Sequence, residues 1–149
     1  MINNQKLVLC DIDGTVANNN HRQNLLKEFK DWDKFFSQLK HDEPIEMVIE
    51  AVKQQVESNN LLIFLTGRPE KYREMTQDWL SEYFDEGFSL LMRKDGDLRN
   101  KIEVKEEIFY ESFERAQIKV CFENDCELIK LWKKLGLNVI DVNGIISGT

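Results

Sequence analysis

Short apolar runs alternate with longer amphipathic stretches along most of the chain. Five of the runs have the length and composition of buried strands, at residues 7–10, 61–65, 89–92, 118–122 and 139–142. The stretches between them are long enough for helices, as in repeated βαβ units. The pattern therefore predicts an α/β fold with a doubly wound, parallel, Rossmann-like sheet of about five strands.

Apolar residues at helical spacing place the helices between these strands. Pro44 can occupy the first position of a helix whose apolar residues recur every three or four positions. Helices are also expected over 71–83 and 100–113. A last helix, with Trp132 on its buried face, is expected to end near Gly136.

One segment, residues 16–43, does not follow this alternation. It is longer than an ordinary βα loop, begins polar and then carries aromatic and aliphatic residues at helical spacing. We expect one or two amphipathic helices, the second capped by Asp31 or Asp33, packed on the core, forming a small lid, or both. No linker interrupts the rest, so residues 1–149 are expected to form a single domain that carries this helical insertion.

Charge and composition limit the classes of function. The net charge of -7 argues against general adhesion to nucleic acid, although Lys and Arg cluster locally in 68–73 and 93–105 among acidic residues. The longest apolar run is too short to cross a bilayer, and residues 1–6 lack the features of a signal peptide. The odd count of 3 cysteines favours free thiols, so a soluble cytoplasmic protein is expected.

Polar motifs follow three of the predicted strands. The motifs are Asp11-Ile12-Asp13-Gly14-Thr15, Thr66-Gly67-Arg68 and Glu123-Asn124-Asp125. In an open parallel sheet, ligands bind beyond the carboxyl ends of the strands, where the strand order reverses. We therefore expect acids, a hydroxyl and an arginine to converge on one site.

The residue types in these motifs suit chemistry on phosphate. Side chains alternate along a strand, so Asp11 and Asp13 point differently and can divide the roles of nucleophile and proton donor. Gly14 permits the tight turn that follows. Oxygen ligands from Asn124 or Asp125 would complete a site that suits Mg²⁺, which would neutralise both a phosphate and the Asp11 carboxylate.

In this order, the motifs resemble those of the haloacid dehalogenase superfamily of phosphotransferases. The resemblance covers about 7–142 and implies that Asp11 is the nucleophile, which becomes an aspartyl phosphate. It implies that Asp13 is the general acid/base, with a backbone carbonyl that contacts Mg²⁺. It also matches Thr66 with the hydroxyl that binds phosphate.

The segments 92–99 and 104–109 are similar to the 3'-phosphatase domain of phage polynucleotide kinase-phosphatases. This resemblance implies that Lys105 is the lysine of the third motif, with Lys101, one turn earlier, as the substitute. It also matches Arg22 and Arg68 with arginines of the family. We expect the guanidinium groups of Arg22, Arg68, Arg93 and Arg99 to grip the scissile phosphate or the neighbouring backbone, and Gly67 to belong to the same phosphate-binding site.

The fourth motif departs from the resemblance. The family usually has two adjacent aspartates there, whereas this chain has Glu123-Asn124 followed by Asp125, so the metal ligand among them stays open. A second departure is that no P-loop occurs in the sequence, so we expect a phosphatase without the kinase half.

The expected function is Mg²⁺-dependent hydrolysis of a phosphate monoester, with the 3'-phosphate end of DNA or RNA as the first choice of substrate. A phosphatase of mononucleotides or other small metabolites is the alternative, favoured by the acidic net charge and disfavoured by the clustered arginines. A binding module with a degenerate site is the third possibility. The nucleophile and its neighbouring acid, Asp11 and Asp13, argue against it.

Overall fold

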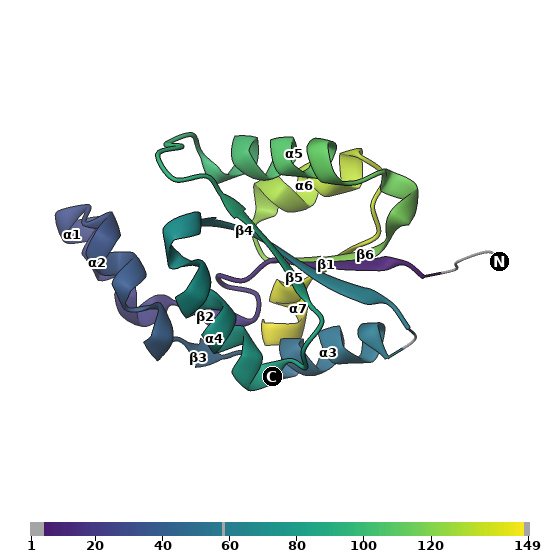
Figure 1. The fold of residues 1–149 in the computed structure, drawn as a ribbon, viewed down its shortest axis with the longest axis horizontal. Helices are drawn as coiled ribbons and strands as arrows, with labels where there is room; N and C mark the ends of the chain where they lie inside the picture. Colours follow the sequence, from purple (N-terminus) through teal and green to yellow (C-terminus); the bar gives the residue numbers. More distant parts are fainter. Residues whose placement is uncertain (1–4, 58, 148–149) are drawn as a thin grey trace.

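The centre of the computed structural model, which describes residues 5–57 and 59–147, is a parallel sheet of five strands (Figure 1). Along the sheet the strands are β5 (Ser89–Arg93), β4 (Leu61–Pro69), β1 (Leu7–Cys10), β6 (Ile118–Glu123) and β7 (Val139–Asp141). All the pairings between neighbours are parallel. The predicted α/β fold is therefore confirmed; residues 1–4 of the N-terminal segment lie outside the described part.

Helices cover both faces of the sheet (Figure 1). One face carries α3 (Glu46–Val56), α4 (Arg73–Tyr83) and α7 (Val142–Ser147), and the other carries α5 (Lys101–Ser112) and α6 (Cys126–Lys134). The alternation of side chains along β1 supplies both cores: Val8 and Cys10 pack with α3 and α4, and Leu9 packs with α5 and α6. Trp132 is buried in the second core, as predicted.

Several predicted boundaries are wrong. The strand predicted at 61–65 continues to Pro69, so Thr66-Gly67-Arg68 lies within β4 instead of following it. Pro44 does not open a helix but lies in β3 (Glu43–Pro44), which pairs antiparallel with β2 (Ala17–Asn18), and α3 begins two residues later. The Ile45 amide donates to the Val16 carbonyl at 2.8 Å, so the backbone next to Pro44 pairs with the segment before β2 and the helix starts only after it. The last strand is one residue shorter than predicted, because Val142 turns inward and begins α7.

Two of the predicted helices end at capping residues, of which Gly136 was expected from the sequence. Asn100 caps α5, with its side chain accepting from the Glu103 amide at 2.9 Å. Gly136 follows α6 with a φ of 87°, a left-handed conformation that suits glycine. The boundary at 71 is the exception, since η3 (Glu70–Tyr72) precedes α4.

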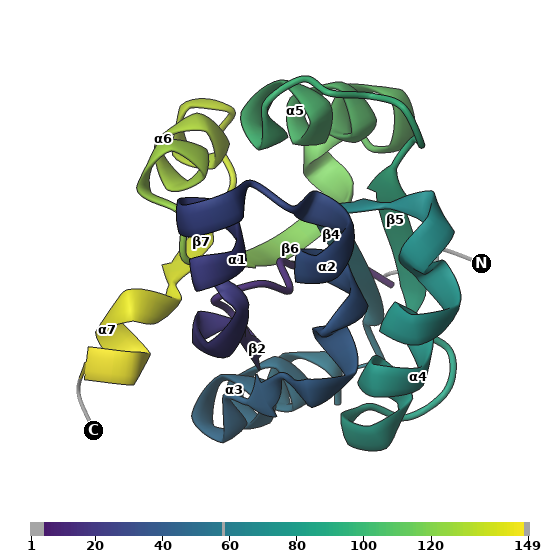
Figure 2. The ribbon, with the colours of Figure 1, turned by 90° about the vertical axis from the view of Figure 1, so that its left-hand side faces the viewer.

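The insertion after β1 contains the two helices that its pattern predicts. Besides β2 and β3, it holds η1 (Asn20–Arg22), α1 (Asn24–Phe29), α2 (Trp32–Ser37) and η2 (Leu39–His41). Asp31 caps α2 by accepting from the Lys34 amide at 3.0 Å. Phe35, Phe36 and Leu39 form a small separate core. In Figure 2, α1 and α2 stand in front of the carboxyl ends of the strands.

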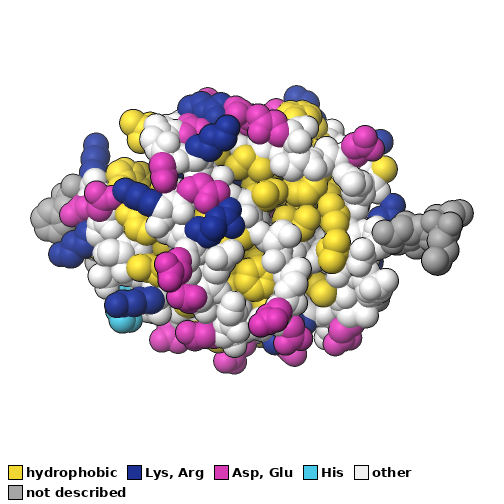
Figure 3. Space-filling view, viewed as in Figure 1, with side chains coloured by type: hydrophobic (Ala, Val, Ile, Leu, Met, Phe, Trp, Pro, Cys, Tyr) yellow, Lys and Arg dark blue, Asp and Glu magenta, His cyan; other side chains and the backbone are white. Residues whose placement is uncertain are grey.

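The surface is mixed in character. Figure 3 shows the molecule from the same side as Figure 1, on which β5 forms an edge of the sheet. Apolar side chains gather on this face, and charged side chains surround them. All three cysteines are free thiols, with Cys10 and Cys121 buried and Cys126 exposed. Among the residues that the structure describes, no helix has the length and apolar character needed to span a membrane.

Candidate active site

A cavity of about 1030 Å³ opens at the carboxyl ends of β1, β4 and β6. Residues of all three polar motifs line it, as the convergence argument predicts. Its outer wall comes from the insertion and from the loop between β5 and α5. The cavity therefore has a floor built from strand ends and a wall built from two segments that reach over them.

Asp11 is buried at the floor and both of its carboxylate oxygens have partners. Lys105 Nζ lies 2.5 Å from Oδ1, and the Thr15 hydroxyl donates to Oδ2 at 2.8 Å. Lys105 also lies 3.4 Å from Glu123 Oε1. Lys101, by contrast, points to Asp125, at 2.5 Å. The structure thus brings Lys105, rather than its substitute, to the predicted nucleophile.

The charges around Asp11 do not balance. Burial and the neighbouring Glu123 raise the pKa of Asp11 to about 7, although Lys105 acts in the opposite direction. Burial alone would lower the pKa of Lys105, but Asp11 and Glu123 raise it, so the ammonium stays charged. One cation serves two carboxylates, and an excess of negative charge remains at the floor of the cavity.

Asp13 has the opposite surroundings. Arg22 Nη2 donates to its Oδ1 at 2.6 Å, and Arg68 donates to both oxygens, at 2.8 and 3.1 Å. Burial alone would raise the pKa of Asp13, but the charges and hydrogen bonds of Arg68 and Arg22 lower it to about 2. Two carboxylates of one motif are thus held in different electrostatic states.

Asp42, which our sequence analysis missed, binds these two arginines without lining the cavity. Its buried carboxylate accepts from Arg22 Nε and Nη2, each at 2.9 Å, and from Arg68 Nη2 at 3.3 Å. His21 Nε2 lies 2.7 Å from the same carboxylate. The sequence contains only a weak indication of this role, which is the position of an acid directly before Glu43-Pro44, where the insertion returns to the sheet.

Arg22 lies behind Asp13 instead of facing the cavity. Its side chain is fully buried, and it does not line the cavity. The guanidinium rests on the ring of Phe35, 4.3 Å from its centroid, and its Nη1 has no hydrogen-bond partner within the described residues. Arg68 is equally buried but does line the cavity. Of Arg22 and Arg68, which both hold Asp13, Arg68 alone borders the space that a phosphate would occupy.

The remaining predicted phosphate ligands border the cavity at different depths. Thr66 is buried at the floor, where its hydroxyl accepts from the Arg68 amide at 3.1 Å. The Gly67 carbonyl accepts from Arg93 Nε at 2.8 Å, and Arg93 also bonds to two carbonyls of the β5–α5 loop. Arg99 lies at the surface and pairs with acidic neighbours. Arg93 therefore fixes the loop that presents Arg99.

The three residues of the fourth motif point in three directions. Glu123 is buried, and its Oε2 accepts from the two amides that follow it, at 3.0 and 3.3 Å. Asp125 caps α6 with Oδ1 and pairs with Lys101 through Oδ2. Asn124 Oδ1 lies 3.3 Å from the Thr15 hydroxyl, which itself bonds to Asp11. Asn124 is thus the member that faces the nucleophile.

Close packing fixes the Asn124 side chain against the first motif. Gly14 has a φ of +80°, and a Cβ there would lie 2.2 Å from Asn124 Nδ2. Asn143 in α7 donates to the Asn124 carbonyl at 2.8 Å. A residue from the C-terminal segment, which the sequence left without a role, therefore supports the fourth motif.

The oxygen atoms near Asp11 are the available donors for a cation. They include the carboxylate of Asp11 and the amide oxygen of Asn124. In residues 5–57 and 59–147, no group of three or more His, Cys, Asp and Glu side chains is placed to hold a metal. Oxygen donors with room for water fit Mg²⁺ better than a softer metal.

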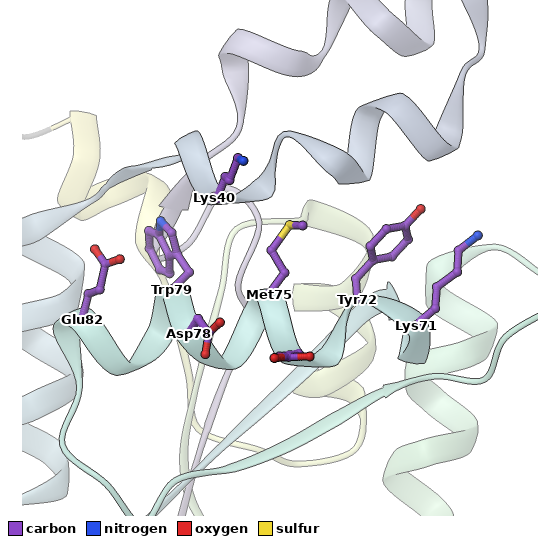
Figure 4. Close-up of a pocket in the computed structure, with 8 residues that line it drawn as sticks. Lys40, Lys71, Tyr72, Met75, Asp78, Trp79 and Glu82 are labelled. Atoms are coloured by element: carbon purple, nitrogen blue, oxygen red, sulfur yellow. The ribbon is translucent and has the colours of Figure 1, made fainter.

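A second, smaller hollow of about 410 Å³ runs along α4 (Figure 4). Met75 and Trp79 point from the helix toward the segment that carries Lys40. Three acids of α4 line it: Glu74, Asp78 and Glu82. Lys40 and Lys71 line it as well, and none of the three polar motifs contributes to it.

Comparison with known proteins assigns the family. The family model of the polynucleotide kinase PNKP phosphatase domain matches residues 5–144. A relative from Autographa californica nuclear polyhedrosis virus, the "Putative bifunctional polynucleotide kinase/RNA ligase", is 28% identical over 139 residues, which are 91% of this chain and 19% of the relative.

Solved structures agree with this assignment. A chain in the structure of the Pnkp1/Rnl/Hen1 RNA repair complex has a TM-score of 0.76 and 26% identity, covering 93% of this chain and 42% of its own. A second Pnkp1/Rnl/Hen1 structure gives the same TM-score and identity, with 92% and 45% covered. This chain spans less than half the length of these proteins. It belongs to the family of polynucleotide kinase PNKP phosphatase domains and is a phosphatase of the haloacid dehalogenase type.

Proposed function

We propose that this phosphatase removes the 3'-phosphate from nucleic-acid ends with Mg²⁺ as cofactor and Asp11 as nucleophile. The observation that carries the proposal is the arrangement of Asp11 at the floor of the cavity. Lys105 and Thr15 each hold one carboxylate oxygen, at 2.5 and 2.8 Å, so the orientation of the nucleophile is fixed before a substrate arrives.

In the first step, an Asp11 oxygen attacks phosphorus, and the bond to the departing 3'-oxygen breaks. Asp13 donates a proton to that oxygen, which leaves as a 3'-hydroxyl. Asp13 then takes a proton from a water molecule that attacks the aspartyl phosphate, and inorganic phosphate and free Asp11 result. Lys105 and the Thr66 hydroxyl stabilise the phosphoryl oxygens as charge develops on them.

Asp13 must gain a proton to act as the acid, and the arginines offer a way to control this. With a pKa of about 2, Asp13 is ionised while Arg68 and Arg22 both hold it. A phosphate dianion in the cavity competes for Arg68, which lines that space. Losing this partner raises the pKa of Asp13 toward the range of a proton donor.

Mg²⁺ would be held by Asp11, Asn124 and the backbone carbonyl of Asp13. The excess of negative charge at Asp11 and Glu123 favours a cation there. When bound, Mg²⁺ neutralises the phosphate and the Asp11 carboxylate together, which removes the repulsion between two anions. The amide oxygen of Asn124 carries no charge, so this metal binds more weakly than at a site with a further aspartate.

The choice of a nucleic-acid end rests on the family and on the cations of the cavity wall. Lys94, Arg99 and Lys101 border the cavity beyond the floor, where a neighbouring backbone phosphate would lie. A phosphatase of small metabolites does not need this outer wall. Turnover of a 3'-phosphorylated oligonucleotide should therefore exceed that of mononucleotides and sugar phosphates; equal or better turnover of the small substrates would contradict the choice.

The nucleophile is tested by Asp11→Asn. Mg²⁺-dependent phosphate release should fall by about 10⁴-fold or more, since no other carboxylate reaches the same position. The variant should keep its far-UV circular dichroism, because the amide has the same shape and the fold stays intact. Full activity in this variant would exclude Asp11 as the nucleophile, and failure of the unaltered protein on a generic aryl phosphate would favour a pure binding module.

A further inference from the structure

The outer wall of the cavity exposes two large apolar side chains. Trp32, at the start of α2, is 58% exposed, and Leu98, in the β5–α5 loop, is 95% exposed. Both line the cavity whose floor holds Asp11. A phosphoryl group needs only the floor, so this apolar wall extends the site toward the part of the substrate that carries the phosphate.

Aromatic packing holds the Trp32 indole in place. It stacks on Phe36 with centroids 5.8 Å apart and an interplanar angle of 24°, and it meets the edge of Phe35. Phe36 in turn lies 5.0 Å from the ring of Tyr72, next to β4. The indole is thus fixed from one side and exposed on the other. A fixed, exposed aromatic ring is the usual platform for a nucleobase, because every base has a π-face that stacks on it.

The charges near this wall suit a polyanion. Lys94 and Arg99 border the cavity beside Leu98, and within the described residues Lys94 makes no ion pair. Two acids of the wall pair with cations: Asp33 with Lys71 at 2.8 Å, and Asp97 with Arg99 at 2.8 Å. A third, Asp95, accepts a hydrogen bond from the Lys71 amide at 3.0 Å.

We propose that Trp32 stacks on the base of the terminal nucleoside, the one whose phosphate Asp11 attacks. This inference rests on the proposed function and adds the part of the substrate that the outer wall recognises. Leu98 closes the opposite side of the base, and Lys94 and Arg99 meet the backbone that leads away from it. The wall thereby favours phosphates carried by a nucleoside over phosphates carried by a sugar alone.

The tryptophans of the chain provide a direct readout. Of the three, Trp79 and Trp132 are 3% and 1% exposed, so only Trp32 can stack on a ligand. The Asp11→Asn variant would be titrated with a 3'-phosphorylated oligonucleotide and with the same oligonucleotide whose terminal residue is abasic. We expect the intact end to quench the fluorescence and the abasic end to bind without quenching.

The titration distinguishes failure of the proposed function from failure of the proposed stacking. If neither oligonucleotide binds by an independent measure such as anisotropy, the nucleic-acid function itself fails. If both bind and quench equally, or if neither quenches, the function stands and the stacking on Trp32 is overturned.

Kinetics on the active enzyme give a second test. Trp32→Ala should lower kcat/KM about tenfold on the intact end, the loss expected for one base–aromatic stack, and leave the abasic end unchanged. Trp32→Phe should keep most of the activity. Tyr110→Ala is the matched control, since Tyr110 is 60% exposed but lies outside the cavity. An equal loss on both ends would assign Trp32 to the packing or closure of the insertion and overturn the proposal.

Discussion

The floor and the outer wall of the cavity differ in how their side chains are held. At the floor, Asp11 and Lys105 are buried and Asp13 is partly buried, and each is bonded to an opposite charge. At the wall, Trp32 and Leu98 are exposed. A buried charge that loses its partner is costly, whereas an exposed side chain can change at little cost in stability. The chemistry thus depends on the most constrained part of the molecule, and substrate recognition on the least constrained part.

This contrast has a consequence for mutations. A change at the floor alters stability and activity together, because the same ion pairs support both. A change at the wall alters substrate binding alone. The following four predictions, ordered by the size of the expected effect, test this division.

Replacing Lys105 should have the largest effect. Lys105→Met keeps the length of the side chain but leaves Asp11 and Glu123 without their shared cation, and should lower the free energy of unfolding by about 3–5 kcal/mol. Phosphate release should fall by about 10²–10³-fold. Denaturant unfolding and steady-state kinetics measure the two effects.

Lys101→Met is the matched control on the same helix, since the Lys101 side chain is 55% exposed and pairs with Asp125. Its stability should change by less than about 1 kcal/mol. The reverse pattern, with activity lost in Lys101→Met and kept in Lys105→Met, would exchange the roles of the two lysines.

Replacing Asp42 should come next, because Asp42 supports the floor without facing the cavity. Asp42→Asn keeps the shape but removes the charge that holds Arg22 and Arg68, so kcat should fall by about 10–100-fold as the arginines lose their fixed positions. KM should change little. Asp78→Asn, an exposed acid of α4, serves as the control, and unchanged kcat in Asp42→Asn would show that Asp13 alone positions the arginines.

Restoring an acid in the fourth motif should strengthen metal binding. Asn124→Asp adds a charged ligand beside Asp11 and should lower the Mg²⁺ concentration for half-maximal activity by about tenfold. Without Mg²⁺ the new charge should lower the melting temperature, and added Mg²⁺ should reverse this loss. If the Mg²⁺ dependence of both activity and melting is unaltered, Asn124 is not a metal ligand.

The smallest effect is expected at the wall. Arg99→Ala removes an exposed guanidinium that already pairs with Asp97 and Glu107. The free energy of unfolding should hardly change, because solvent screens this exposed pair. KM for an oligonucleotide should rise about threefold at low salt, with the difference shrinking as salt increases. A large loss of kcat would mean that the guanidinium turns to the reacting phosphate.

The sequence predicted the fold and the floor of the cavity well. The short apolar runs of β1, β4 and β6 indicate a buried parallel sheet, and such a sheet brings its strand ends to one edge. For this reason the nearness of Asp11, Thr66 and Lys105 followed from local pattern and resemblance. Pro44 was misplaced because its strand pairs with a segment 27 residues earlier, and a local window does not contain that partner.

Asp42 and the division of the fourth motif were decided by tertiary structure. Asp42 acquires its role only when the insertion folds back and places its carboxylate against two arginines from distant segments. Glu123, Asn124 and Asp125 offer similar oxygens, and the packing of Gly14 and Lys101 determines which of them faces Asp11. The sequence alone thus determined which chemical groups reach the site, because the position of each polar motif at the end of an apolar run is a local property. Only the folded chain decided which partner each charge meets, because that choice depends on contacts between residues far apart in sequence.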